Sequence, residues 1–396
     1  MLTTTSFIRF WSILEKKFEV RPFKRFLGFE RQMEASQGLA CCADQTLLLD
    51  IHGSVWGAGD NRQGALSQVT VEENMDYFAK LPDMPSVVSL TTGYNRSYFI
   101  DDKGAVWACG NNGGGRLGIG IDPQKQFFFA PRQVQLEAKV RKISANSNNI
   151  TLFLDDSGCV WKTGEVSAKE DLSSVPSKIE GVPPIIDIAV GSSYYLLLDE
   201  NNRVWAHGRN VGQFGIQGNE YVNSTRIDTL PPIAAVFTGY DSTLFLDVDG
   251  NALSIGNRAC FSDHVSAANV PYLIGNHPRF TQLSATQYHF LGITEDREVY
   301  SAGRNGNGEL GRASIQTPKK VENLPPISTV YAGNGTSLFV DLEGSVFACG
   351  SNSRKKLGIG WRPQASQIFK IENIAPVMQH SQRPFLRQST KSARKV

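Results

Sequence analysis

The chain has no apolar run of about 18 residues, which excludes a membrane-spanning helix. It also lacks a short apolar segment followed by a small-residue cleavage site, so a secretory signal is not expected. Cysteine is scarce, with six in 396 residues and one adjacent pair. This pattern matches neither a disulfide framework nor a zinc site. We therefore expect a soluble protein with reduced cysteines in the cytoplasm or the nucleus.

The motifs of common enzymes are missing as well. The sequence contains no phosphate-binding P-loop, no H-E-x-x-H and no G-x-S-x-G. Two stretches match G-x-G-x-x-G, at residues 113–118 and 306–311, but neither opens a helix inside a strand–helix–strand unit. We interpret both as turns. No catalytic residue, metal ion or cofactor is expected.

Charge is distributed unevenly along the chain. Residues 1–31 hold seven Lys/Arg and three Glu, a net of +4, and residues 380–396 hold five Lys/Arg and no acid, a net of +5. The whole chain carries +2, so residues 32–379 carry 2 − 9 = −7. An acidic body is a poor surface for nucleic acid, and only the basic ends suit such binding.

The sequence repeats itself seven times. Each unit has a short apolar run, an Asp-x-x-Gly turn or a variant of it, an apolar pair such as Val55-Trp56, and a terminal glycine. The terminal glycines are Gly59, Gly110, Gly164, Gly208, Gly256, Gly303 and Gly350. They are 51, 54, 44, 48, 47 and 47 residues apart. A period of about 50 residues is typical of propellers and other repeat architectures.

Each unit is predicted to consist of β-strands. An apolar run, a tight turn and a returning apolar pair describe a hairpin, and the prolines between units mark strand starts or links. Because the runs are apolar throughout, both faces of each small sheet should be covered. We predict an all-β protein, a seven-bladed β-propeller of four-stranded antiparallel blades, over residues 35–376. The blades are expected at about 35–85, 86–137, 138–183, 184–232, 233–279, 280–326 and 327–376.

The two ends differ from the repeats. Phe7, Trp11, Leu14 and Phe18 form an amphipathic helical stripe within residues 1–34. Three roles stay open for this helix: a cap on the propeller or a partner, a mitochondrial presequence, or a basic arm toward nucleic acid or membrane. Residues 377–396 form a basic tail whose end we expect to be disordered. Ring closure could use residues 19–34 in the last blade, which we favour, or residues 377–386 in the first.

The turn between the first two strands of each blade is the predicted contact surface, since propeller strands are committed to packing. Tyr and Arg dominate protein–protein hot spots, and several such turns contain them. The candidate partner-binding residues are Asp44, Tyr94, Asn95, Arg96, Tyr194, Tyr240, Asp241, Tyr288 and His289.

The repeat resembles that of the regulator of chromosome condensation family. The hairpin is followed in five units by Asn-x-x-Gly-x-Leu-Gly or a close variant. These stretches begin at Asn61, Asn112, Asn210, Asn305 and Asn352. The resemblance implies a seven-bladed propeller. It also implies a link to the small GTPase Ran, because the family includes a Ran exchange factor that contacts the GTPase with acids and histidines in these turns.

This sequence keeps little of that cluster, namely His289, Asp44 and Asp241, so we identify it as a divergent member. We predict a non-catalytic, monomeric protein-interaction propeller that regulates a small GTPase. The alternative is a guanine nucleotide exchange factor for a Ran-like GTPase.

Overall fold

The computed structural model describes residues 38–378, apart from 43, 68–73, 83, 146–149, 165–172, 218–219, 240–241, 257–269, 276, 287, 314–316 and 373. All of them belong to one compact unit, Ser36–Val396. The predicted N-terminal helix and all of the basic tail except Val377 and Met378 lie outside the described residues.

The strands form seven sheets of four, each in chain order and antiparallel throughout. Blade 1 consists of β1 (Leu39–Cys41), β2 (Gln45–Leu49), β3 (Val55–Asp60) and β4 (Asn74–Lys80), and blade 2 of β5 (Val87–Gly93), β6 (Arg96–Asp101), β7 (Val106–Asn111) and β8 (Phe127–Gln133). Blade 3 consists of β9 (Val140–Ala145), β10 (Thr151–Asp155), β11 (Val160–Gly164) and β12 (Ser173–Lys178), and blade 4 of β13 (Ile185–Val190), β14 (Tyr194–Asp199), β15 (Val204–Arg209) and β16 (Tyr221–Arg226). Blade 5 consists of β17 (Ile233–Thr238), β18 (Ser242–Asp247), β19 (Ala252–Gly256) and β20 (Tyr272–Leu273). Blade 6 consists of β21 (Phe280–Ala285), β22 (His289–Thr294), β23 (Val299–Gly303) and β24 (Lys319–Lys320), and blade 7 of β25 (Ile327–Gly333), β26 (Thr336–Asp341), β27 (Val346–Ser351) and β28 (Gln364–Lys370).

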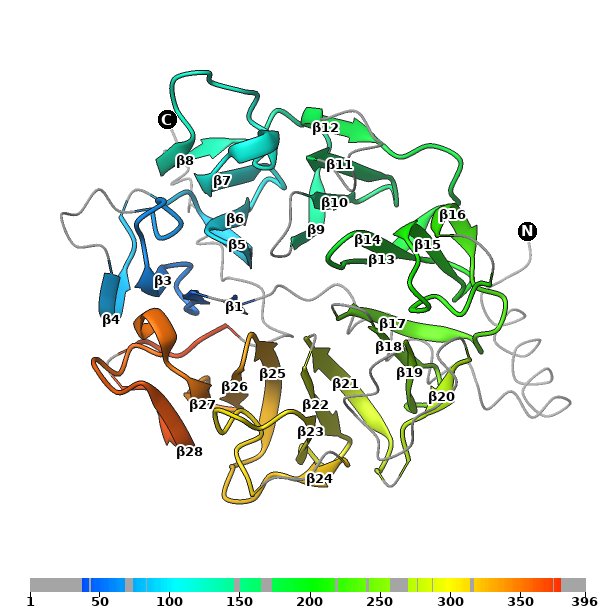
Figure 1. Cartoon of the computed structure of the whole chain (residues 1–396). Helices are drawn as coiled ribbons and strands as arrows, with labels where there is room; N and C mark the ends of the chain where they lie inside the picture. The colour runs from blue at the N-terminus through cyan, green and yellow to red at the C-terminus, as the bar shows by residue number, and fades with distance from the viewer. Residues whose placement is uncertain are drawn as a thin grey trace, which may run out of the picture. The chain divides into compact units, whose positions relative to one another are not determined.

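These sheets surround a common axis, with the first strand of each blade innermost (Figure 1). The predicted seven-bladed propeller is therefore confirmed. Two short 3₁₀ turns, η1 (Gly113–Gly115) and η2 (Ser353–Lys355), stand between the third and fourth strands of blades 2 and 7. The described part of the chain contains no helix that could cross a membrane.

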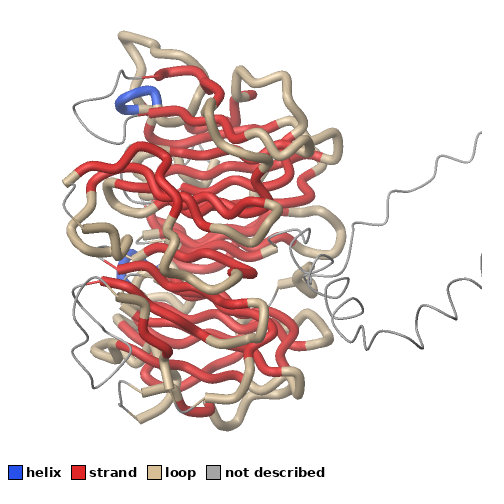
Figure 2. The backbone as a smooth tube through the Cα atoms, turned by 90° about the vertical axis from the view of Figure 1, so that its right-hand side faces the viewer, coloured by secondary structure: helices blue, strands red, loops and turns tan. Residues whose placement is uncertain are grey.

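The up-and-down strand order gives the ring two different faces. The turns between first and second strands and the loops between third and fourth strands lie together on one face, which we call the turn face. The Asp-x-x-Gly hairpins and the proline links lie on the other, the hairpin face. Figure 2 shows the strands edge-on between the two faces, with η1 and η2 on the same side.

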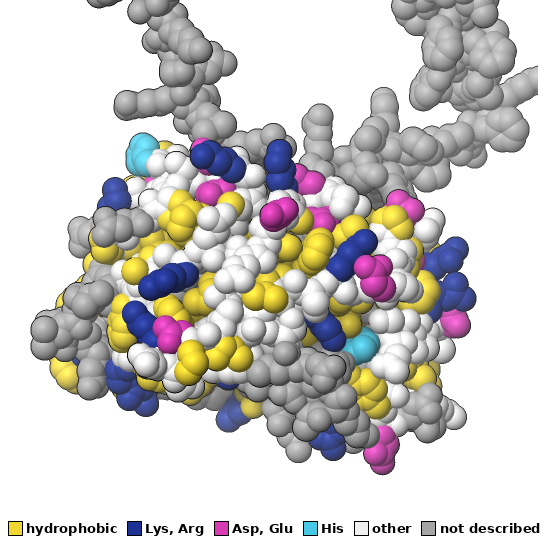
Figure 3. Space-filling model, turned by 90° about the horizontal axis from the view of Figure 1, so that it is seen from above, with side chains coloured by type: hydrophobic (Ala, Val, Ile, Leu, Met, Phe, Trp, Pro, Cys, Tyr) yellow, Lys and Arg dark blue, Asp and Glu magenta, His cyan; other side chains and the backbone are white. Residues whose placement is uncertain are grey.

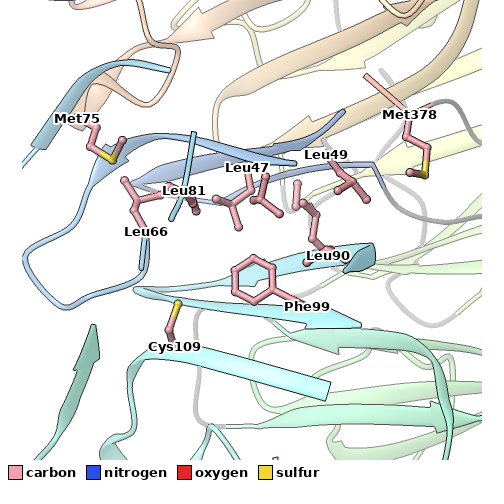
Figure 4. Close-up of a cluster of buried hydrophobic side chains, with 12 residues drawn as sticks. Leu47, Leu49, Leu66, Met75, Leu81, Leu90, Phe99, Cys109 and Met378 are labelled. Atoms are coloured by element: carbon pink, nitrogen blue, oxygen red, sulfur yellow. The ribbon is translucent and has the colours of Figure 1, made fainter. Parts of the chain in front are cut away.

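The core lies between neighbouring blades. In β2, Leu47 and Leu49 pack toward blade 2, against residues such as Leu90 and Phe99 (Figure 4). Leu48, which points the opposite way, belongs to the cluster shared with blade 7. Successive residues of a strand alternate between faces, so a strand buried on both sides is apolar at every position. This explains the continuous apolar runs in the sequence.

Each Asp-x-x-Gly hairpin is held together by its own aspartate. In blade 3, Asp155 Oδ1 accepts the backbone N–H groups of Ser157 and Cys159, each at 2.9 Å, and Oδ2 accepts Trp161 Nε1–H at 2.9 Å. Partial burial opposes ionisation, but the hydrogen bonds from Ser157, Trp161 and Cys159 outweigh it and lower the pKa of Asp155. The same Asp–Trp bond recurs in three other blades, as Asp50–Trp56, Asp101–Trp107 and Asp199–Trp205. These carboxylates therefore serve the fold.

The ring closes in blade 1 through a composite inner strand. Val377 pairs with Asp50 in the position that Val87 has opposite Asp101 in blade 2, and β1 completes the strand. Met378 donates its N–H to the Leu49 carbonyl at 2.8 Å. Of the two expected closures, the structure shows the second, with residues 377–378 in the first blade. The closure that we favoured, by a strand from residues 19–34 in the last blade, is therefore wrong. Blade 7 already has four strands, all from residues 327–370.

Removing these closing residues should weaken the whole ring. Val377 is 1% and Met378 3% exposed, and burying such side chains contributes about 1.5–3 kcal/mol each. We expect a chain ending at Pro376 to be less stable than a chain ending at Met378 by about 3–6 kcal/mol, measured as the free energy of unfolding in urea. Equal urea midpoints for the two chains would show that closure does not depend on this strand.

Candidate protein-binding face

The inner turns of the turn face do not expose all of their predicted contact residues. Tyr94 is 41% exposed at the tip of the blade 2 turn, and its neighbour Asn95 is buried in a left-handed conformation, with φ of 55°. Asp44 and Tyr288 are half-buried. Tyr240 and Asp241 lie outside the described residues.

Arg96, Tyr194 and His289 are all buried, at 0%, 1% and 0% exposure. Each is the first residue of its blade's second strand and pairs with the terminal glycine of the repeat. At this glycine the third strand approaches closely: a Cβ on Gly110 would lie 2.7 Å from Arg96 Cα. The side chains are directed into the interface with the following blade rather than into solvent.

These three side chains bind the next blade. Arg96 Nη2 donates to the Ile150 carbonyl of blade 3 at 3.2 Å, and Tyr194 donates its hydroxyl to the Ser242 carbonyl of blade 5 at 2.8 Å. His289 Nε2 lies 3.0 Å from Ser337 Oγ of blade 7. Blade 1 uses the same position, where Gln45 Nε2 donates to two carbonyls of blade 2. We call these residues the interblade clamps.

Burial, reinforced by the positive charge of Lys356, lowers the pKa of His289 to about 3. The imidazole is therefore neutral at physiological pH and forms hydrogen bonds with the hydroxyl groups of Thr286 and Ser337. In this state it has a structural role in the clamp.

The exposed remainder of the turn face includes charged groups that the sequence pattern did not single out. The guanidinium of Arg304 lies 5.2 Å from the centre of the Tyr288 ring, a cation–π pair on blade 6. Its only signal in the sequence is its place directly after the terminal Gly303.

Asp44 on blade 1 has a raised pKa, because burial and the negative charge of the nearby Asp60 outweigh the positive charges of Lys356, Arg354 and Arg62.

Comparison with known proteins gives the family. The model of the regulator of chromosome condensation repeat matches residues 103–153 and again residues 280–309. Two of the seven repeats therefore match the model of this family, and the chain resembles a divergent member. Each matched segment includes a terminal glycine, Gly110 or Gly303, and the conserved asparagine that follows it, Asn112 or Asn305.

Several relatives match over most of their length. The regulator of chromosome condensation of Xenopus laevis is 23% identical over 367 residues, covering 79% of this chain and 85% of the relative. The guanine nucleotide exchange factor SRM1 of Saccharomyces cerevisiae is 21% identical over 397 residues, covering 81% and 82%. The crystal structure of yeast Prp20p, described with its binding to Gsp1p and histones, superposes with a TM-score of 0.72 at 20% identity, covering 87% and 88%. That structural likeness supports the fold.

The buried histidine predicts a pH dependence of stability. Between pH 6.5 and about 3, the unfolded chain binds a proton at residue 289 that the folded chain does not bind. The free energy of unfolding is therefore unaffected by this group above pH 6.5. As the pH is lowered below 6.5, it decreases by about 1.4 kcal/mol per pH unit because of this group. We expect the wild type to lose stability relative to His289→Gln as the pH of urea unfolding is lowered from 7.5 to 4.5. A difference between the two proteins that is constant with pH would contradict this account.

Proposed function

We propose that this protein is a non-catalytic, protein-binding propeller that regulates a small GTPase through its turn face. The observation that carries the proposal is the contrast between the two faces. On the hairpin face, the carboxylates repeat from blade to blade and are engaged in local hydrogen bonds. On the turn face, the corresponding residues differ in each blade and include exposed Tyr94 and the Tyr288–Arg304 pair.

Residues with one local structural task, such as the hairpin aspartates, repeat, whereas residues that a partner selects need not, because the partner meets each blade at a different place. Tyr and Arg combine a large contact area with a polar group, and they are enriched at interface hot spots. The similarity to a guanine nucleotide exchange factor and to a protein described as binding Gsp1p supports a small GTPase as the partner.

Exchange activity is the finer form of this proposal. An exchange factor makes no covalent bond; it binds the nucleotide-free GTPase more tightly than the loaded form, and this difference in affinity accelerates release. Of the acid–histidine cluster that the family resemblance implies, His289 is buried in a clamp. Among the described residues of that acid–histidine cluster, only Asp44 is partly exposed on the turn face, where a partner could contact it.

The turn face is tested with Tyr94→Ala/Tyr288→Ala. Release of a fluorescent guanine nucleotide is followed for a panel of small GTPases that includes a Ran-type member, alongside pull-down of the nucleotide-free and loaded forms. We expect the wild type to retain the nucleotide-free form of one GTPase and the double variant to bind it at least tenfold more weakly, since two hot-spot aromatics cost about 1.4 kcal/mol or more together.

The matched control is Ile51→Ala/Leu342→Ala, which removes exposed apolar side chains from the hairpin face, 39% and 47% exposed. It should bind like the wild type. If the folded Tyr94→Ala/Tyr288→Ala protein keeps its partner at full affinity, the turn-face proposal is wrong. Binding without accelerated release would limit the function to interaction and remove exchange.

A further inference from the structure

The loop between β27 and β28 of blade 7 has an unusual backbone. Blades 1, 2 and 6 have a glycine three residues after the conserved asparagine, namely Gly64, Gly115 and Gly308, each at positive φ. Blade 7 has Lys355 there, with φ of 63°, preceded by Arg354 with φ of 56°. A residue with a Cβ pays about 1–2 kcal/mol for this conformation. Strain of this kind is concentrated at functional sites.

Glycine at this position has a clear packing reason. In these three blades the loop meets the outer strand of the next blade: a Cβ on Gly115 would lie 2.5 Å from Ser174 Cα, and one on Gly308 would lie 2.6 Å from Ser366 Cα. In blade 7 the loop crosses the ring seam to β4 of blade 1. There the lysine ammonium forms an ion pair with the Asp76 carboxylate, next to a backbone hydrogen bond from the Gly360 N–H to the Asp76 carbonyl at 3.0 Å.

The same loop displays a tryptophan. Trp361 is 84% exposed, more than any other large apolar residue among those the structure describes. Lys355 Nζ lies 3.7 Å from the centre of its ring. Tyr77 of β4 is 66% exposed, and its hydroxyl lies against Gly360: a Cβ there would be 2.9 Å from the oxygen. Two aromatic side chains are therefore held in solvent at the seam.

The surroundings of this tryptophan are basic. Residues 351–371 contain five Lys/Arg and no Asp or Glu, on a body that carries a net −7 over residues 32–379. The neighbouring Asp60 already accepts three side-chain hydrogen bonds from Arg62, two from Nε at 3.0 and 3.1 Å and one from Nη2 at 2.5 Å. Arg354 is half exposed and 3.9 Å from Asp60, and exposed Arg362 has no carboxylate partner within the described residues.

We propose that this seam patch, formed by Tyr77, Arg354, Lys355, Trp361 and Arg362, binds an acidic, extended peptide segment of a partner protein. Trp and Arg are residue types enriched at interface hot spots, and the excess of positive charge in this patch favours an acidic sequence. Nucleic acid would require a long basic stripe. The patch instead covers one loop and Tyr77 of the adjacent β4, and elsewhere the surface mixes charges of both signs, as on the side shown in Figure 3.

This inference goes beyond the proposed GTPase contact. The inner turns that carry Tyr94 and Tyr288 lie near the axis of the ring, whereas η2 lies beside β4 at the outer edge (Figure 1). The seam patch would therefore recruit or orient a second polypeptide while the inner turns stay free.

A display library of random 12-residue peptides tests the patch. The library is selected on the full-length wild type and counter-selected on Trp361→Ala/Arg362→Glu. We expect the surviving peptides to be enriched in Asp and Glu and to bind the wild type in fluorescence anisotropy at least tenfold more tightly than this variant. Binding should weaken as salt is raised, because charge pairs at an exposed surface are screened.

Three further proteins keep the test specific. Lys103→Glu/Lys139→Glu is the matched control for Arg354→Glu/Arg362→Glu, since it makes the same change in charge at exposed lysines near a hairpin turn. It should bind selected peptides like the wild type, whereas the reversal at the seam should lose them. Lys355→Gly introduces the glycine that blades 1, 2 and 6 have at this position. We expect this variant to fold and to bind the selected peptides more weakly than the wild type.

Several results would overturn the proposal. One is a selected pool without acidic enrichment, or equal binding by the seam and control variants. Another is tighter binding of a 12-nucleotide single-stranded DNA than of any selected peptide, which would replace the peptide with nucleic acid. Nucleotide release by the GTPase panel should be unchanged in Trp361→Ala, so a failure of this inference is separable from a failure of the proposed function.

Discussion

The burial of both faces of every four-stranded sheet is the constraint on which the structure depends. A strand such as β2 is apolar on both sides, so each blade needs a neighbour on its left and on its right. An open array would leave one apolar face of the first and of the last blade in water. The ring must therefore close, and the composite strand of β1 and Val377 joins the two ends of the repeat region in one sheet.

This constraint assigns the side chains of each repeat to separate tasks. The hairpin aspartates organise their own turns, and in four blades they also accept a hydrogen bond from the ring nitrogen of a tryptophan six residues later. The clamp position, occupied by Gln45, Arg96, Tyr194 and His289 in four blades, ties each blade to the next. Because the clamp needs only a hydrogen-bonding side chain of sufficient reach, its chemistry varies while its geometry is constant. Variation at a position can therefore reflect packing as well as partner choice.

The seam differs physically from the other blade junctions. In blades 1, 2 and 6 a glycine three residues after the conserved asparagine approaches the next blade, whereas at the seam Lys355 occupies this position and pairs with the Asp76 carboxylate. The exposed Trp361 and the strained backbone occur at this junction.

The sequence alone determined the number of blades, their strand order and their hairpins, because each depends on contacts within about 15 residues and on a period repeated seven times. It also placed the turns correctly along the chain. It could not tell Tyr94, which is exposed, from Tyr194, which is buried: both stand in equivalent turns, but one is two positions closer to the turn tip. Tyr94 lies in the turn itself, whereas Tyr194 is the first residue of β14 and its hydroxyl binds the next blade.

Only the tertiary structure decided the closure and the seam. Val377 and Asp50 are more than 300 residues apart, and no local pattern marks them as partners. The same holds for Lys355 and Asp76, whose ion pair exists because the seventh blade returns to the first. Local periodicity specifies a repeat, whereas contacts between the ends of the array depend on the curvature accumulated over all seven blades.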